Sequence, residues 1–200
     1  KLMSVKFFYN PIEDAGNLME PPVAPGYADR YPIGEYKPQP FSIEQKIEWL
    51  ADIKFLPAQL ENAVLNLDEA QLHTPYRDGG WTVHQLVHHV ADSHMNAYIR
   101  VKLALTEDNP TIKTYEEQLW AELNDVQKLP INISLTLLHA LHIRWHEAMK
   151  LVTDDQWNNR TLFHPVQKKT MRLWTLLGMY AWHGRHHVAH ITKLRERMKW

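Results

Sequence analysis

Hydrophobic residues recur with the spacing of α-helices over most of this 200-residue chain. Apolar side chains three and four residues apart fall on one face of a helix, whereas strict alternation marks a strand. No segment alternates in this way, so no strand is expected, and residues 154–169 are interpreted as a loop. The helical pattern covers residues 43–67, 82–105, 134–152 and 170–197. Four amphipathic helices of this length predict an all-α fold, an antiparallel four-helix bundle.

Proline changes this picture in the first 40 residues, which hold seven of the 12 prolines. Proline lacks a backbone N–H and biases the residue before it toward extended geometry. Residues 1–40 are therefore expected to form an irregular Pro-rich N-terminal arm, and residues 41–200 the four-helix-bundle domain. In the first helix Ser42 is the expected N-cap, and Pro57 is expected to kink or split the helix.

Charge and cysteine content exclude several function classes. The chain has 22 Lys and Arg against 23 Asp and Glu, so it lacks the basic excess that binds nucleic acid. It has no cysteine, which excludes disulfides, Cys-ligated zinc and a cysteine nucleophile. The longest nearly uncharged apolar run, residues 173–182, is shorter than the about 20 residues that cross a bilayer. A cytoplasmic protein with neither a nucleic-acid nor a membrane partner is expected.

The 13 histidines are the main departure from average composition, and two overlapping pairs lie on the last predicted helix. His183 and His187 form one pair with i,i+4 spacing, and His186 and His190 form the other. Residues four apart share a helical face, so either pair could present two imidazoles to one ion. The apolar stripe of this helix contains His187 and borders His183, while the other pair is expected further toward solvent.

The helix over residues 82–105 offers ligands from a facing element of the bundle. His94 lies in its apolar stripe and His89 flanks the stripe, while His84 and His88 are expected to point outward. Periodicity alone leaves His89 and His94 as open alternatives. On the helix over residues 134–152, His142 is the most inward histidine.

A buried histidine has two interpretations, and pattern alone leaves both open. A single inward imidazole is most often a hydrogen-bonded core residue. Two inward imidazoles at i,i+4 are harder to account for, because each unsatisfied buried polar group costs about 1–3 kcal/mol. One bound metal ion satisfies both rings at once.

Four motifs carry a resemblance to a known family. They are YPIGEY at 31–36, TPYRDGGWTV at 74–83, VHHVADSHMN at 87–96 and the histidine-rich stretch WHGRHHVAH at 182–190. With them the chain resembles the DinB-like superfamily and, within it, the YfiT group of metal-dependent hydrolases. The resemblance covers residues 31–200, and residues 1–30 have no counterpart in it.

The resemblance implies a four-helix bundle, often dimeric, with a metal triad of one histidine on the second helix and an i,i+4 pair on the fourth. Matched motif by motif, the triad is His89, His183 and His187, which resolves the choice between His89 and His94. One divalent metal ion per chain is implied, zinc in the first place and nickel as the alternative. Three protein ligands leave a coordination position open, as in catalytic sites.

Two further residues are candidate catalytic groups. Asp92 stands three residues after His89 and could accept a ligand N–H or assist proton transfer. His190 replaces a glutamine that many superfamily members have, and the resemblance implies the same replacement in the YfiT group. This histidine could act as a base. A solvated surface acid and a structural histidine are the competing interpretations of these two residues.

Three functions follow from such a site. The first is a metal-dependent hydrolase acting on a small-molecule substrate. The second is a metal-dependent S-transferase that uses a low-molecular-weight, bacillithiol-like thiol as cosubstrate, because the chain has no cysteine of its own. The third is a non-catalytic, metal-binding structural dimer. A homodimer is expected in each case.

Overall fold

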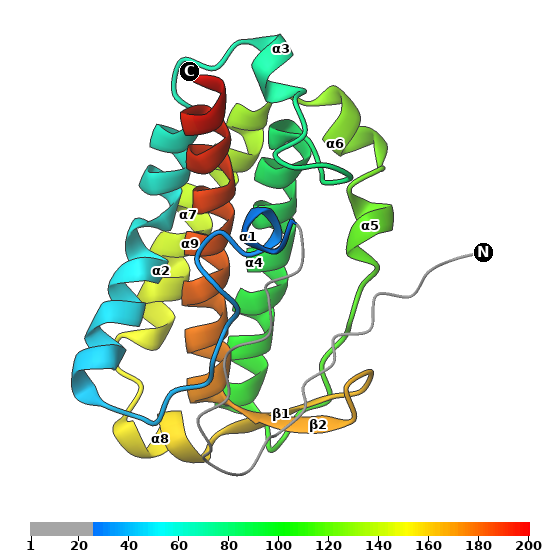
Figure 1. Ribbon diagram of the computed structural model, residues 1–200. Coiled ribbons are helices and arrows are strands. Elements are labelled where there is room, and N and C mark those ends of the chain that lie inside the picture. The colour runs from blue at the N-terminus through cyan, green and yellow to red at the C-terminus, as the bar shows by residue number, and fades with distance from the viewer. Residues whose placement is uncertain (1–25) are drawn as a thin grey trace.

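Four long helices pack side by side in the computed structural model, which describes residues 26–200 (Figure 1). The predicted four-helix bundle is confirmed. Residues 1–25, the first part of the predicted arm, lie outside the described residues. The bundle helices are α2 (Ile43–Val64), α4 (Val83–Thr106), α7 (Ile131–Met149) and α9 (Leu173–Met198).

Short elements connect and cover the bundle. The helices among them are α1 (Tyr27–Arg30), α3 (Glu69–Leu72), α5 (Glu117–Trp120), α6 (Asn124–Lys128) and α8 (Asp154–Asn159). Before α9 the chain forms an antiparallel hairpin of β1 (Thr161–His164) and β2 (Lys169–Arg172), in which Leu162 is opposite Met171. The expectations of a loop and of no strand are wrong for this segment. The sequences of these strands, TLFH and KTMR, do not alternate apolar and polar residues, so periodicity did not identify them.

The helices are not all antiparallel to their neighbours, so the predicted antiparallel arrangement holds for only part of the bundle. Around the bundle α2 contacts α7 and α9, and α4 contacts the same two helices. The pairs α2–α7 and α4–α9 are antiparallel, whereas α2–α9 and α4–α7 are parallel (Figure 1). The cause is the connection over residues 107–130, which carries α5 and α6 back along the bundle. Helix α7 therefore begins at the end at which α4 begins.

Helix α2 runs through Pro57 without a break, so Pro57 does not split the helix, and the alternative expectation of a kink stays a prediction. A proline at this position cannot supply the N–H that the carbonyl of Ile53, four residues earlier, would normally accept. Ile53 is 1% exposed, so water does not replace that donor. The carbonyl is instead hydrogen-bonded by Nδ1 of His142 on α7.

Buried apolar residues form two clusters stacked along the bundle. The cluster near the hairpin contains Trp145 and Trp157, and the cluster near the opposite end contains Leu60 and Leu138. On α4, α7 and α9, buried or half-buried histidines occupy positions between those that the two clusters use. They are His94, His142, His183 and His187. A layer of imidazoles thus separates the two halves of the core.

The described part of the arm packs along α9 through backbone carbonyls and aromatic rings. Trp174 Nε1 donates to the carbonyl of Gln39 at 2.8 Å, and Trp182 Nε1 donates to the carbonyl of Gly34 at 3.0 Å. In the other direction, the Tyr36 hydroxyl donates to the carbonyl of Thr175 at 3.3 Å. Residues 31–40 therefore form part of the folded domain rather than a separate unit.

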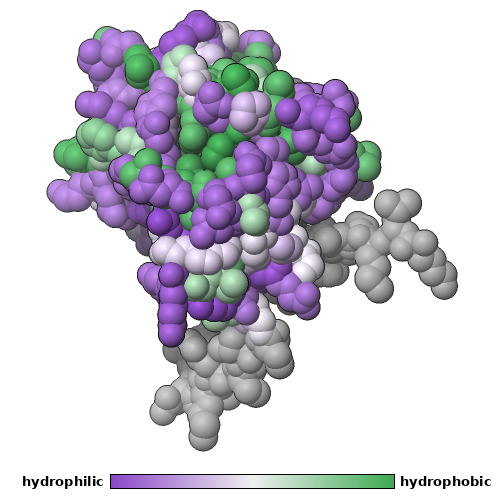
Figure 2. Space-filling view, turned by 90° about the horizontal axis from the view of Figure 1, so that it is seen from above, coloured by the Kyte–Doolittle hydropathy of each residue, from purple (hydrophilic) through white to green (hydrophobic). Residues whose placement is uncertain are grey.

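The polar and apolar surface is unevenly distributed. At the end of the bundle where α9 terminates, Figure 2 shows hydrophobic side chains at the surface within a border of hydrophilic ones. None of the helices in residues 26–200 combines the length and the apolar character needed to cross a bilayer.

We expect Gly178→Ala to destabilise the protein, although alanine is the better helix former. A Cβ at Gly178 would lie 2.5 Å from Trp49 Cη2 and 2.7 Å from the Tyr36 hydroxyl. Helix propensity alone would add about 1 kcal/mol of stability, whereas overpacking costs typically about 1–3 kcal/mol. Urea denaturation should therefore show a lower free energy of unfolding, and a gain in stability would contradict this packing.

Candidate metal centre

His89 on α4 meets two members of the imidazole layer, His183 and His187, on the antiparallel helix α9. Nε2 of His183 lies 3.4 Å from Nε2 of His89 on α4 and 3.1 Å from Nε2 of His187 on α9. One ring nitrogen from each of the three residues lies within 4.8 Å of the others. The structure thus brings together the residues predicted as metal ligands; their binding of an ion stays a prediction.

The spacing of these nitrogens fits a divalent ion. Zinc binds histidine nitrogen at about 2.0–2.1 Å with tetrahedral geometry, which places two ligand nitrogens about 3.3 Å apart. The separations of His183 Nε2 from the other two ε nitrogens, 3.1 and 3.4 Å, lie on either side of this value. Three protein ligands would occupy three corners of such a tetrahedron and would leave the fourth corner for water or substrate.

Burial prepares these rings to act as ligands. It lowers the pKa of His89 to about 4, and it lowers the pKa values of His183 and His187 well below their ordinary range. The rings are therefore neutral near pH 7, so a metal ion would not have to displace a proton from them. His89 is 5% exposed and His187 6%, whereas His183 is only half-buried.

Aromatic and polar groups surround the triad. The Trp81 ring lies 4.5 Å from the ring of His89 between centroids, and its Nε1 donates to Gln118 Oε1 at 3.1 Å. Nδ1 of His183 lies 3.1 Å from Nε2 of His94. By contrast, Nδ1 of His187 is buried without a hydrogen-bond partner among the described residues. Among the three predicted ligands, His183 is thus the one whose Nδ1 is hydrogen-bonded by another imidazole.

A second cluster shares His187 with the first. Nε2 of His190 lies 3.0 Å from Nε2 of His186, and both residues are within ligand spacing of His187. The expectation that this pair lies toward solvent is wrong, because His186 is 8% exposed and His190 3%. Irregular segments, which helical periodicity does not describe, cover the pair.

The cover over this second cluster is aromatic and cationic. The Tyr76 ring lies 4.2 Å from the ring of His190, and the Trp182 ring is stacked 4.5 Å from that of His186. Burial, with the nearby positive charge of Arg77, lowers the pKa of His186 to about 4. Burial, with His186 and Arg77, lowers that of His190 to about 3. A guanidinium that opposes protonation here also opposes a metal cation, so the triad with His89 and His183 is the better metal site.

For four other histidines the sequence predicted whether the side chain points inward or outward, and two of these predictions are confirmed. His94 is fully buried and His142 is 1% exposed, so their inward placement is confirmed. His84 and His88 were expected to point outward, but they are 7% and 5% exposed. Nε2 of each bonds the carbonyl of Leu129, which belongs to the long connection before α7. The covering segment again explains the difference.

Asp92 lies on α4 one turn after His89, but its carboxylate is not part of the triad cluster. Burial, with the neighbouring charge of Asp125, raises its pKa to about 6. A carboxyl group with a pKa near neutrality can exchange protons at physiological pH. Its catalytic role stays a prediction, as does that of His190.

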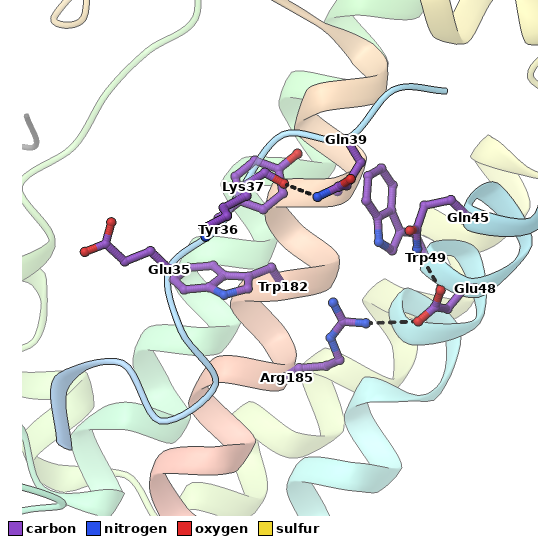
Figure 3. Close-up of a pocket in the computed structure, with 10 residues that line it drawn as sticks. Glu35, Tyr36, Lys37, Gln39, Gln45, Glu48, Trp49, Trp182 and Arg185 are labelled. Atoms are coloured by element: carbon purple, nitrogen blue, oxygen red, sulfur yellow. Dashed lines mark hydrogen bonds and ion pairs between the residues drawn. The ribbon is translucent and has the colours of Figure 1, made fainter. Parts of the chain in front are cut away.

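The groove drawn in Figure 3 lies on another face of α9. Its volume is about 310 Å³, and it lies between residues 35–39, α2 and α9, with Trp49, Trp182 and Arg185 in its lining. Arg185 pairs with Asp52 at 2.7 Å and with Glu48 at 3.6 Å. None of the triad histidines lines this groove. We therefore place the candidate chemistry at the triad and not here.

Comparison with known proteins agrees with this geometry. The family model of the DinB superfamily matches residues 52–191. A Bacillus subtilis protein named "Putative metal-dependent hydrolase YfiT" is 51% identical over 171 residues, which covers 85% of this chain and 96% of that protein. A Bacillus cereus protein named "Putative metal-dependent hydrolase" is 53% identical over 173 residues, covering 86% and 98%.

A solved structure shares the whole architecture. The structure of YfiT from Bacillus subtilis superposes with a TM-score of 0.84 at 50% sequence identity, covering 86% of this chain and 99% of that one. It is described as a probable metal-dependent hydrolase with an unusual four-helix bundle topology. The mixture of parallel and antiparallel neighbours found here fits that description of the topology.

We expect the metal-free protein to lose stability steeply on acidification below pH 6.5. A histidine whose folded pKa lies below its unfolded value contributes stability that is fully present above pH 6.5. That contribution is lost as the pH falls toward the folded pKa, because the unfolded chain binds more protons. Each such ring contributes a slope of up to about 1.4 kcal/mol per pH unit. The rings with this shift include His89, His94, His142, His183, His186, His187 and His190.

Three carboxyl groups oppose this trend. Burial raises the pKa of Asp52 and of Asp92 to about 6, and it also raises the pKa of Glu117, so protonation of these groups on acidification favours the folded state. The seven histidines outweigh the three carboxyl groups, and the net effect is a loss of stability. Urea denaturation at pH 7.5, 6 and 5 measures it. An unchanged free energy of unfolding over this range would contradict the neutral, buried state of the rings.

We expect His183→Ala and His187→Ala to weaken zinc or nickel binding by at least about 100-fold, more than the loss of an outer-shell group. The matched controls are His186→Ala and His190→Ala, which alter the neighbouring pair on the same helix and should retain the metal. Elemental analysis of purified, dialysed proteins gives the metal content. Metal retained by both triad variants, or lost equally by the controls, would contradict the assigned site.

Proposed function

The chain belongs to the DinB superfamily, and we propose that it is a metal-dependent hydrolase whose ion is held by His89, His183 and His187. The observation that supports the proposal most directly is the convergence of three neutral ε nitrogens with the spacing of a tetrahedral site. The names of the relatives at 51–53% identity point the same way.

The donor set indicates the kind of ion. Three imidazoles without cysteine or carboxylate suit zinc, and nickel is the alternative. Bound there, such an ion would supply Lewis acidity, which polarises a substrate carbonyl and lowers the pKa of water. His183 is only half-buried, and we propose that a small molecule from solvent reaches the cluster on its side.

The chain's own residues have distinct roles in this proposal. The three ligands fix the position at which a substrate carbonyl is activated. Trp81, beside His89, limits the access of water and offers an apolar surface for substrate. Asp92, with a pKa raised to about 6, is our candidate for the group that exchanges a proton with the reacting water or leaving group. We also propose that the protein acts as a homodimer, as the resemblance implies.

We expect the zinc-loaded protein to hydrolyse small activated esters or amides without any added thiol. Chelation should abolish turnover and added zinc should restore it, and His187→Ala should reduce it to the background rate. The matched control is His139→Ala on α7, which changes a side chain that is 43% exposed and pairs with Glu61; this variant should remain active.

Two outcomes would contradict simple hydrolysis. Turnover that appears only with a cysteine-derived thiol would instead establish the S-transferase. A zinc-loaded protein without turnover on either class of substrate would favour the structural metal-binding dimer.

A further inference from the structure

Behind His183 a line of hydrogen bonds crosses the core between the two apolar clusters. Nδ1 of His183 meets Nε2 of His94 at 3.1 Å, and Nδ1 of His94 meets Nε2 of His142 at 3.0 Å. Nδ1 of His142 then meets the backbone carbonyl of Ile53. The line joins α9, α4, α7 and α2, so every helix of the bundle contributes one member.

The last acceptor determines the position of every hydrogen in this line. A carbonyl oxygen can only accept, so His142 must carry its hydrogen on Nδ1. In the neutral ring Nε2 of His142 then accepts, and His94 must donate from Nδ1. The same reasoning places the hydrogen of His183 on Nδ1. Its Nε2 therefore carries the lone pair, and this nitrogen points toward His89 and His187.

The carbonyl at the end of the line is available because of a proline. In an α-helix the carbonyl of Ile53 would accept the N–H of residue 57, and Pro57 has none. Without that donor the buried oxygen needs another partner, and His142 supplies it. The line also ends there, because an amide oxygen does not take up a proton near pH 7. The hydrogens are held in place and are not conducted through the core.

We propose that His94 and His142 are positioning residues, which hold His183 in the Nδ1–H tautomer and thereby present its Nε2 lone pair to the metal position. The inference rests on the proposed metal site. It goes beyond that site because it assigns two residues that do not belong to the triad. Outer hydrogen bonds of this kind typically contribute about 10–100-fold to metal affinity.

The tautomers are tested first in metal-free protein labelled with ¹⁵N-histidine. Ring ¹⁵N shifts distinguish a nitrogen that carries hydrogen from one with a lone pair, and single His→Gln substitutions assign the signals. We expect hydrogen on Nδ1 of His94, His142 and His183. Hydrogen on Nε2 of His183 would overturn the proposal, whether or not the protein binds metal.

The effect on binding is tested by zinc competition against a chromophoric chelator. We expect His94→Leu, which can neither donate nor accept, to bind zinc about 10–100-fold more weakly. His94→Gln, whose amide can accept from His183 and donate to His142, should bind nearer to wild type. The control is His139→Leu on α7, at a side chain that is 43% exposed, and it should bind as wild type does.

The two proposals fail in different ways. If the wild-type tautomers are as expected but zinc does not bind, the line stands and the metal site is wrong. If zinc binds and His94→Leu binds it as tightly as wild type, or His94→Gln is as weak as His94→Leu, the positioning role is wrong. Circular dichroism checks the fold of each variant, and should His94→Leu not fold, the wild-type tautomers decide.

Discussion

A buried imidazole must either find hydrogen-bond partners or bind an ion, and this requirement governs the centre of the molecule. Two apolar clusters fill the ends of the bundle, and a layer of histidines separates them. Burial keeps these rings neutral, so each of them offers one donor and one acceptor. The positions of α2, α4, α7 and α9 are coupled through this layer, because a shift of one helix would leave a ring without its partner. Fold and candidate site therefore depend on the same set of contacts.

The sequence predicted those features that a single helix determines. Periodicity located the four long helices, and it placed His187 inward and His183 beside the core stripe. It did not choose between His89 and His94, because both lie near the inward face of α4; the family resemblance made that choice. The structure shows why both positions carry histidine. His89 faces the other two members of the triad, while His94 supports His183 from behind.

Features that depend on the packing of irregular segments were beyond such reasoning. His84 and His88 are covered by the connection before α7, and His186 and His190 by Tyr76 and other aromatic rings. Helical periodicity reports which side of a helix faces the bundle, and it contains no information about loops that fold over the other sides. The direction of α7 could not be predicted from periodicity either, because a long connection can return the chain to either end of the bundle. His94 and His142 were both recognised as inward, but only the order of helices around the bundle shows that they meet.

The proline within α2 has a consequence for how this protein can be improved or can evolve. A proline in a helix interior lowers helix stability by about 3 kcal/mol relative to alanine, so selection for thermal resistance alone would favour its replacement. Any other residue at position 57 would bring a backbone N–H to the oxygen that His142 uses. A more stable helix α2 would then leave the tautomer of His183 less strictly determined. Stabilising substitutions should therefore be sought at positions other than 57. If proline is retained at position 57 despite its cost in helix stability, selection for function would explain its retention.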